Sequence, residues 1–338
     1  MENIDFEKII NHNLIKILKT DDIIYDNKNN KIKLAVALSG GSDSLALTIA
    51  LHKLNYDVLA ILVNHNLRVE AKKEIQQTIK TISKYNIKYI VKEWDGNVNK
   101  NLENEARNAR YSLLLEACRE NNIKYLCIGH HMDDQVETFL LNLARGSGLD
   151  GLCSMPYLKK IDNINIIRPM LNLTKQDCVN YLTSKNISWC EDASNKDTKY
   201  KRNKIRYLLE QIEDKQILNK RICQSVSILQ EVRETVDILI NQTAKNIASY
   251  IVDEREKIIS ISFKQKDFLN LTGYLQKSLL VKFIMQISGK VYKPRLFQIE
   301  NIVKDINNKQ SLKRTLAECI IAMKDNTITI SRQIKNKI

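Results

Sequence analysis

The stretch LAVALSGGSDSLALTIALHKL, residues 34–54, decides the fold that this chain is expected to adopt. Residues 34–38 are a continuous apolar run, and residues 45–52 continue with apolar side chains at helical spacing. The residues between them, SGGSDS at 39–44, combine glycines, serines and an aspartate. This order predicts a strand, a tight loop and a helix. Because glycine permits close backbone approach and a helix start attracts anions, we expect the loop to bind a phosphate group.

Two common glycine-rich phosphate motifs do not fit this loop. A Walker A loop needs a lysine after its glycines, and the dinucleotide fingerprint needs G-x-G-x-x-G. The loop instead resembles the S-G-G-x-D-S loop of the PP-loop ATP pyrophosphatases, which split ATP into AMP and pyrophosphate. The alternative, an ordinary glycine-serine turn, explains neither the strand before the loop nor the helix after it. The expected ATP-binding residues of the loop are Ser39, Gly40, Gly41, Ser42, Asp43 and Ser44, with Asp43 also a candidate Mg²⁺ ligand.

Composition limits the classes of protein that need to be considered. The 338 residues are enough for two or three domains, and 53 Lys and Arg against 39 Asp and Glu leave a formal charge of +14. A polyanion is therefore a sensible partner. No apolar run approaches the roughly 18 residues of a membrane span, and the first residues lack a cleavage signal, so we expect a cytoplasmic protein without a membrane partner. Seven cysteines without a C-x-x-C pair argue against a disulfide framework or a cysteine-held metal.

Apolar runs alternate with helical patterns along the first half of the chain. Strands are predicted at 34–38, 57–65, 87–94 and 124–130, and helices at about 43–55, 71–85, 102–121 and 133–144. This alternation predicts an α/β fold with a doubly wound parallel sheet. Ligands of such sheets bind at the carboxyl ends of the strands, where polar clusters stand at 39–44, 64–68 and 129–137. We expect the three clusters to meet in one crevice.

The third cluster begins the stretch GHHMDDQVETFLLNLARGSGLDG, residues 129–151. If a helix starts after the two histidines, Asp133 and Asp134 lie four and three residues before Glu137, on one face of that helix. Carboxylates this close repel one another unless a cation lies among them, so the pattern indicates a metal or an organic ammonium. A solvated acidic helix start, favoured by the helix dipole, is the alternative.

Six motifs in order carry a resemblance that runs to about residue 206. They are SGGSDS, NHNLR, ENEARNARY, GHHMDDQVETFLLNLARGSGLDGL, IRPML and EDASNKDTKYKRNKIR. The chain resembles the tRNA(Ile)-lysidine synthetase family in this set. The resemblance implies that ATP adenylates C2 of cytidine 34 in the CAU anticodon of tRNA(Ile) and that free L-lysine then displaces AMP. The product, lysidine, pairs with A, so that the tRNA reads AUA.

The residue chemistry is compatible with these two steps. Arg107 and Arg110 can stabilise the adenylate, and His65 joins the expected ATP site at the second strand end. Lysine, with a pKa near 10.4, is free amine to only about one part in a few thousand at neutral pH. Asp134 and Glu137, with Asp43 as a further option, are therefore the candidates to bind the ammonium and accept its proton. The expected catalytic residues are Asp43, Asp134, Glu137, Arg110 and Arg206.

A basic stretch, CEDASNKDTKYKRNKIRYLL at 190–209, follows the acidic cluster. Its cations are Lys196, Lys199, Lys201, Arg202, Lys204 and Arg206, with Tyr200 and Tyr207 as candidate stacking surfaces. A basic helix on a solvated face is the alternative. Similarity to the family pattern favours an RNA-facing segment. The expected tRNA-binding residues are Lys199, Lys201, Arg202, Asn203 and Arg206.

The second part of the chain has a different pattern. Helical periodicity from about 207 to 252 predicts a helical connector and bundle, and a small α+β unit follows at about 258–334. We therefore expect a PP-loop catalytic domain at 1–212, and a connector with a small tRNA-binding domain at 213–338. The further carboxyl-terminal domain of longer family members is not evident. How tRNA(Ile) is told from tRNA(Met) is thus left open.

Three other classes stay open at the level of sequence. Another PP-loop enzyme, such as a tRNA thiolase, fits the loop, although the paired cysteines often used for sulfur transfer are missing. A metal hydrolase built from His130, His131, Asp134 and Glu137 would leave the loop without a task. A non-catalytic RNA-binding protein would retain tRNA without releasing AMP. The sequence leaves open the oligomeric state, with a homodimer as one option, the number of metal ions, and which of Asp133 and Asp134 contacts lysine.

Overall fold

The structure is a computed structural model with two compact units, residues 1–230 and 231–338. It describes residues 5–19, 31–64, 69–94, 102–190, 201–290, 292–308 and 311–333. The division falls inside the long helix α9 (Lys215–Ile247). Each unit has its own hydrophobic core.

The first unit is built on a six-stranded sheet in the order β3-β2-β1-β4-β6-β5. Its strands are β1 (Lys33–Ala37), β2 (Asp57–Asn64), β3 (Lys88–Glu93), β4 (Tyr125–Ile128), β5 (Leu158–Ile161) and β6 (Ile164–Ile167). All neighbours pair in parallel except β5, which runs antiparallel to β6. The predicted doubly wound parallel sheet is therefore confirmed. The hairpin of β5 and β6 adds an antiparallel edge that the sequence analysis did not predict.

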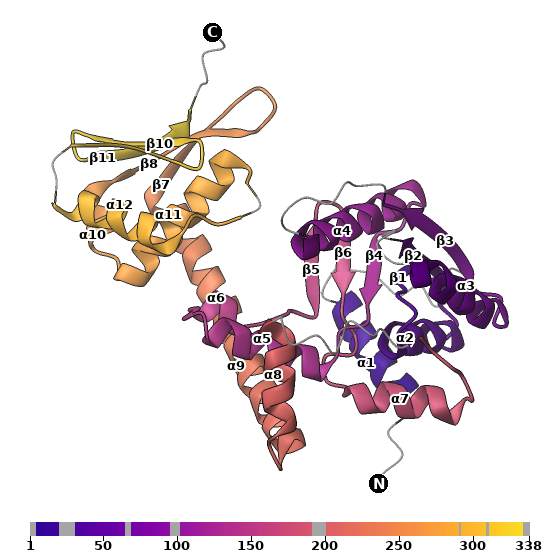
Figure 1. The fold of residues 1–338 in the computed structure, drawn as a ribbon. Helices are drawn as coiled ribbons and strands as arrows, with labels where there is room; N and C mark the ends of the chain where they lie inside the picture. The colour runs from indigo at the N-terminus through magenta and orange to yellow at the C-terminus, as the bar shows by residue number, and fades with distance from the viewer. Residues whose placement is uncertain are drawn as a thin grey trace. The chain divides into compact units, whose positions relative to one another are not determined.

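Helices cover both faces of this sheet (Figure 1). The helices before α9 are α1 (Phe6–Lys19), α2 (Ser42–Lys53), α3 (Val69–Ser83), α4 (Leu102–Glu120), α5 (Met132–Leu143), α6 (Leu149–Leu152), α7 (Lys175–Ser184) and α8 (Lys201–Glu210). Of these, α1, α2, α3 and α7 pack on one face of the sheet and α4 packs on the other. Alternate strand residues face opposite cores: Val36 packs with α1, α2 and α7, whereas Ala35 packs with α4. Both faces of the central strands are thus buried, which explains their continuous apolar runs.

The second unit is an antiparallel sheet with helices on one face (Figure 1). Its strand order is β7-β8-β11-β10-β9, and its core contains Phe263, Phe268 and Phe283. The elements are β7 (Ala248–Val252), β8 (Ile258–Lys264), α10 (Gln265–Leu269), α11 (Gly273–Ser288), α12 (Leu296–Asn308), β9 (Leu312–Leu316), β10 (Cys319–Lys324) and β11 (Thr327–Arg332). The expected small α+β unit is confirmed.

One predicted boundary in the connector is wrong. The helical periodicity predicts a helix up to residue 252, but α9 ends at Ile247 and residues 248–252 form β7. Tyr250, Ile251 and Val252 favour a strand, and β8 supplies a partner for their backbone groups. Between α8 and β7 the described chain forms the single helix α9 rather than a bundle.

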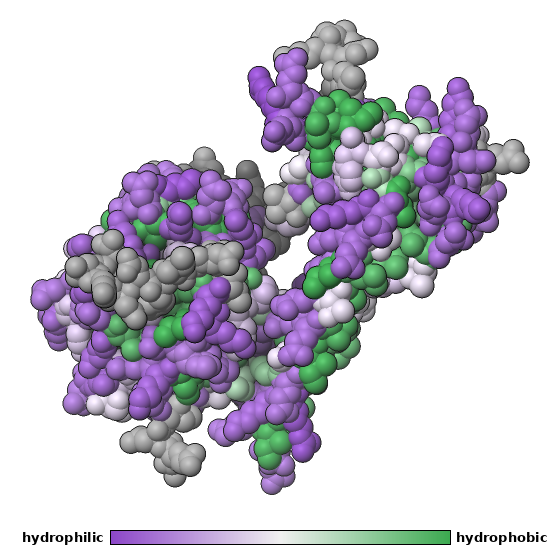
Figure 2. Space-filling model, turned by 180° about the vertical axis from the view of Figure 1, so that it is seen from behind, coloured by the Kyte–Doolittle hydropathy of each residue, from purple (hydrophilic) through white to green (hydrophobic). Residues whose placement is uncertain are grey.

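The described surface and the seven cysteines have the following properties. Hydrophilic residues cover most of the visible face of the first unit (Figure 2). Among the described helices, none combines the length and the apolar character that a membrane crossing requires. All seven cysteines lie in described segments and are free thiols, five of them buried.

Candidate active site

The glycine-serine loop connects β1 to α2, as the sequence predicts. Gly40 has φ +90°, and a Cβ atom there would lie 2.5 Å from the Thr78 hydroxyl, so glycine is required at this position. Ser39 donates from its backbone N–H to Ser44 Oγ at 3.1 Å. No side chain caps α2 at Gly41. The N–H groups at the start of α2 therefore lack a side-chain cap and suit an anion.

The end of β4 closes against this loop. A Cβ atom on Gly129, the first residue beyond β4, would lie 3.0 Å from the backbone nitrogen of Ser44 and 3.1 Å from the Asp43 carbonyl. Glycine at this position lets two strand ends approach each other closely. Clusters 39–44 and 129–137 therefore meet at one edge of the sheet, as expected. Residues 65–68, which include His65, lie outside the described residues.

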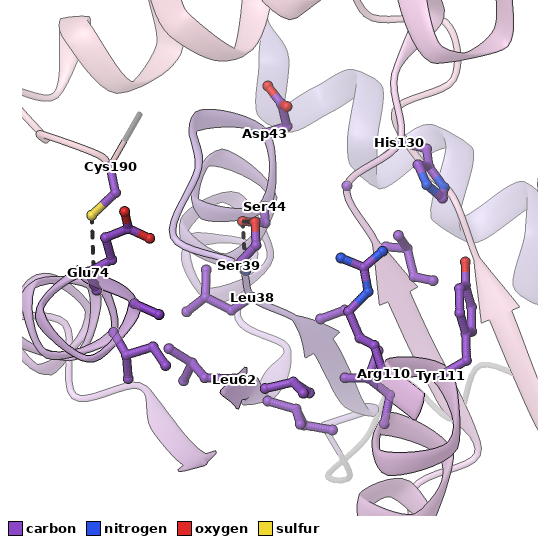
Figure 3. A pocket seen from close by; sticks show the side chains of 18 of the residues that line it. Leu38, Ser39, Asp43, Ser44, Leu62, Glu74, Arg110, Tyr111, His130 and Cys190 are labelled. Atoms are coloured by element: carbon purple, nitrogen blue, oxygen red, sulfur yellow. Dashed lines mark hydrogen bonds between the residues drawn. The ribbon is translucent and has the colours of Figure 1, made fainter. Parts of the chain in front are cut away.

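A cavity of about 430 Å³ opens beside the loop (Figure 3). Ser39, Asp43 and Ser44 line one side of it. Arg110 of α4 and His130 after β4 line the cavity from another side, and Figure 3 shows both side chains directed into it. The remaining lining residues include Leu38, Ile61, Leu62, Val63, Ala71, Glu74, Ile75, Tyr111, Leu114, Asp134 and Cys190. An apolar wall with a few convergent charges is typical of a small-molecule site.

A buried histidine supplies one of the cations that the acidic cluster requires. His131, at 4% exposure, places Nε2 3.5 Å from carboxylate oxygens of Asp43 and Asp134. Its Nδ1 lies 3.3 Å from Asp133 Oδ2, an ion-pair contact that is not aligned as a hydrogen bond. Burial alone would lower the pKa of His131, but the three carboxylates raise it to about 10. His131 is therefore an imidazolium at neutral pH.

Two arginines of α8 supply the other cations. Glu137, at 3% exposure, accepts hydrogen bonds from Arg202 Nε at 2.9 Å and from Arg206 Nη2 at 3.2 Å on the same oxygen. Arg206 Nε donates to its second oxygen. Asp134 Oδ1 lies 4.0 Å from Arg202 Nη2 and 3.9 Å from Arg206 Nη2. The acidic cluster and the basic stretch are therefore two halves of one ionic site.

Asp133 does not share the face of Asp134 and Glu137. Its carboxylate accepts from the backbone N–H of Lys175 at 2.9 Å and from Asn219 Nδ2 at 3.0 Å. Burial opposes ionisation, but the contact with His131 and the backbone N–H of Lys175 lower the pKa of Asp133 to about 2. The expected three-carboxylate face is thus wrong for Asp133, because its side chain joins α5 to the starts of α7 and α9. Asp134 is the aspartate of the pair that lines the cavity.

The remaining candidates are placed as follows. Lys199 lies outside the described residues, and for Arg107 the structure describes only its position in α4. Lys201 is exposed at the start of α8, and Asn203 is half-buried there. Sequence reasoning missed Asn219, because its contact with Asp133 spans 86 residues and leaves no local pattern. It considered His131 only as a ligand in the metal-hydrolase alternative and did not predict that His131 is a cation.

The donor set also bears on a metal ion. In the described ranges, no three side chains of the His, Cys, Asp and Glu types are grouped so that they could hold one. Mg²⁺ is commonly held by one or two carboxylates together with substrate phosphates. Asp43 fits this arrangement, because it stands at the phosphate loop and its side chain is partly exposed.

The fold and the loop define a PP-loop protein, and the family model described as the PP-loop domain matches residues 7–213. The chain is 36% identical over 314 residues to a tRNA(Ile)-lysidine synthase of Wolbachia pipientis wMel, covering 90% of this chain and 71% of the relative. It is 35% identical over 314 residues to a tRNA(Ile)-lysidine synthase of Rickettsia bellii (strain OSU 85-389), with the same coverages. The chain belongs to the tRNA(Ile)-lysidine synthase family.

A solved structure shares the fold. It is a U34-tRNA thiolase from Methanococcus maripaludis, with a TM-score of 0.53 at 21% identity. The likeness covers 67% of this chain and 80% of that chain. At this identity the likeness concerns the arrangement of strands and helices alone.

Proposed function

We propose that this chain ligates free L-lysine to C2 of cytidine 34 in the CAU anticodon of tRNA(Ile), using ATP and releasing AMP and pyrophosphate. Membership of the family supports the reaction. The observation that carries the proposal is the ionic site at the cavity: an uncapped phosphate loop stands beside Asp134, next to Glu137 and two arginines. A cytoplasmic location is part of the same proposal, because the substrate is a tRNA.

The first step makes the C2 oxygen of cytidine a leaving group. That oxygen attacks the α-phosphorus of ATP, and the bond from this phosphorus to the β-phosphate oxygen breaks, which releases pyrophosphate. The N–H groups at the start of α2, with Ser39 and Ser44, hold the departing phosphates. Arg110 faces the cavity and neutralises charge on the α-phosphate. Mg²⁺ held by Asp43 and phosphate oxygens would supply further positive charge.

The second step uses lysine as the nucleophile. Its amine attacks C2, the bond from C2 to the adenylated oxygen breaks, and AMP leaves. In our proposal Asp134 and Glu137 bind the ammonium, and Asp134 accepts the proton. Glu137 already binds two guanidinium groups, but a carboxylate offers about four lone-pair sites. Arg202 and Arg206 can also face the carboxylate of the amino acid, so a site of mixed charge fits a zwitterion.

The polynucleotide is proposed to contact two surfaces. The first is the basic stretch with Lys199, Lys201, Arg202, Asn203 and Arg206, of which the last four are in α8. The second is the face of the carboxyl-terminal sheet opposite its helices, called here the open sheet face. Its outward positions are Ser249, Ile251, Ser260, Ser262, Lys264, Lys313, Thr315, Ile320, Ala322, Lys324, Thr327, Thr329 and Ser331.

The chemistry of the open sheet face supports contact with an RNA backbone. Hydroxyls and lysines dominate these described positions, and no carboxylate is among them. Lys264 Nζ donates to Thr327 Oγ1 at 3.0 Å, which places a cation beside a row of hydroxyls. Such groups bind phosphate and ribose oxygens, and without an aromatic side chain the face has no platform for base stacking. We therefore assign it to the sugar-phosphate backbone rather than to base recognition.

The reaction can be tested with an unmodified tRNA(Ile) transcript, ATP and labelled lysine. We expect label to enter the tRNA only when ATP is present and position 34 is cytidine. Pyrophosphate release in the absence of lysine should show the first step alone. Equal labelling of a transcript with uridine at position 34 would contradict the proposal, and so would labelling without ATP.

A further inference from the structure

A buried arginine holds one of the histidines that line the cavity. Arg168, at 5% exposure, follows β6 and donates from Nε to His130 Nδ1 at 3.2 Å. Its Nη1 donates to the Pro156 carbonyl at 2.9 Å. The guanidinium group is planar and rigid, so two hydrogen bonds from Nε and Nη1 to separate acceptors fix the orientation of its plane. Neither the phosphate loop nor the ionic site of Glu137 uses Arg168.

This contact determines which ring nitrogen of His130 carries the proton. Arginine only donates, and it stays protonated in proteins. Nδ1 must therefore present its lone pair to Arg168, which leaves the single ring proton of the neutral imidazole on Nε2. His130 lines the cavity, and Figure 3 shows its side chain directed into the space beside Arg110. The Nε2–H group therefore belongs to a side chain that lines the cavity.

We propose that Arg168 is a positioning residue that keeps His130 in its Nε2–H form, and that His130 donates this hydrogen bond to the α-phosphate of ATP and of the adenylated base. The assignment to phosphate rests on the proposed function. Both chemical steps change the charge on α-phosphate oxygens, first as pyrophosphate leaves and then as AMP leaves. A preorganised neutral donor stabilises such oxygens without giving up its proton. Arg110, which lines the same cavity, complements it with a full charge.

The tautomer can be measured without substrate. We expect ¹⁵N NMR of the full chain, labelled on histidine, to show His130 with an unprotonated Nδ1 and a protonated Nε2. In Arg168→Met, which keeps an apolar stem but removes the donors, the two tautomers should exchange. A wild-type His130 protonated on Nδ1, or a tautomer unchanged in Arg168→Met, would overturn the positioning role whatever reaction the chain catalyses.

Two substitutions of His130 separate the donor role from a structural one. The amide nitrogen of glutamine falls near histidine Nε2, whereas asparagine reaches only the Nδ1 position. For pyrophosphate release with ATP and tRNA, His130→Gln should stay within about 10-fold of the wild-type kcat, and His130→Asn should lose about 100-fold, with little change in KM for ATP. If the contact with Arg168 is only structural, Asn should preserve activity better than Gln, and that order would refute the donor role.

The variants also distinguish this inference from the proposed function. If neither the wild type nor any variant releases pyrophosphate, the proposed reaction is wrong. The NMR spectrum still decides which tautomer His130 adopts. Should Arg168→Met not fold, the His130 pair and the wild-type spectrum suffice. A loss in Arg168→Met that matches His130→Asn in kcat, with KM for ATP retained, is the result expected from positioning.

Discussion

At the scale of single residues, buried charges and their partners build the site. His131 lies among three carboxylates, and Glu137 lies between two guanidinium groups. Removing an ion from water costs several kcal/mol unless it is paired and hydrogen-bonded, so each of these groups requires the others. The sequence predicted that a cation belongs among the carboxylates. It could not show that the protein itself provides three of them, because nothing in a pattern of spacings places α8 beside α5.

The paired imidazolium predicts how stability depends on pH. The pKa of His131 is raised from 6.5 to about 10 in the folded state, so its contribution is complete below pH 6.5 and is lost as pH rises toward 10. Between these pH values the free energy of unfolding of the wild type should therefore fall more steeply with pH than that of His131→Gln. The difference between the two slopes should reach up to about 1.4 kcal/mol per pH unit. Urea unfolding at several pH values measures this, with His12→Gln, an exposed histidine of α1, as a control. Parallel slopes for wild type and His131→Gln would contradict it.

The second residue-scale prediction concerns Glu137. In Glu137→Gln the shape is kept and the negative charge is lost, so the α8 arginines lose a charged partner, and so does the lysine ammonium in the proposed second step. We expect lysine incorporation in a single turnover to fall by about 2–4 kcal/mol, roughly 30- to 1000-fold, while pyrophosphate release without lysine largely survives. Glu116→Gln on the exposed side of α4 controls for loss of a carboxylate. If pyrophosphate release and lysine incorporation fall equally, Glu137 acts on ATP and its assignment to the lysine site is wrong.

At the scale of elements, the site depends on how helix starts are fixed. Thr174 Oγ1 accepts from the Asp177 backbone N–H at 3.1 Å, and Asp177 accepts from the Thr174 backbone at 2.7 Å, which is a reciprocal cap at the start of α7. The next residue, Lys175, donates its N–H to Asp133. The cap therefore fixes the first turn of α7, which contacts α5 through Asp133, and α5 carries the acidic side chains.

Thr174→Ala should uncap α7. The loss of one capping oxygen costs about 1 kcal/mol, so the free energy of unfolding should drop by this amount. Thr183→Ala, an exposed position in the same helix, is the matched control and should change it by less than about 0.5 kcal/mol. Denaturant titration of both variants measures the difference. Equal effects of the two changes would show that the cap contributes nothing specific.

The elements also show what a single sequence can predict. The strands and helices around the phosphate loop lie within a few residues of their predicted bounds, because hydrophobic period and loop chemistry are local signals. The spacing of Phe6, Ile10, Leu14 and Ile17 marks the buried face of α1, a helix that is not among the predicted elements. The bonds from Arg206 to Glu137 span 69 residues, and that from Asn219 to Asp133 spans 86. Such contacts depend on the assembled fold, so local patterns cannot supply them.

At the scale of the whole molecule, the charge of +14 and the division into two units lead to one expectation. If both units bind tRNA, the salt dependence of binding should be the sum of contacts on each. The first unit contributes the basic stretch, and the second contributes the open sheet face. Replacing cations of one unit by uncharged residues should then lower the slope of the salt dependence. The reaction at a site in the other unit should be unaffected.

The open sheet face offers the sharpest test of this expectation. Changing Lys264, Lys313 and Lys324 together to glutamine removes three cations and leaves no buried group unpaired, because all three are exposed. Each lost phosphate contact should lower the slope of log K against log salt by roughly 0.7–0.9, so we expect a decrease of about 2. The matched control, Lys266→Gln with Lys277→Gln and Lys304→Gln, removes three cations from the helical side of the same unit.

This pair of triple variants separates net charge from position. Both lower the charge of the chain equally, so long-range attraction falls equally. Only the open-face variant should flatten the salt dependence measured by filter binding between about 50 and 200 mM salt. Turnover at saturating tRNA should stay at the wild-type value, because the proposed sites for ATP and lysine lie in the first unit. If both variants change the slope alike, the second unit contributes diffuse charge, and the open sheet face is not the surface that the tRNA backbone contacts.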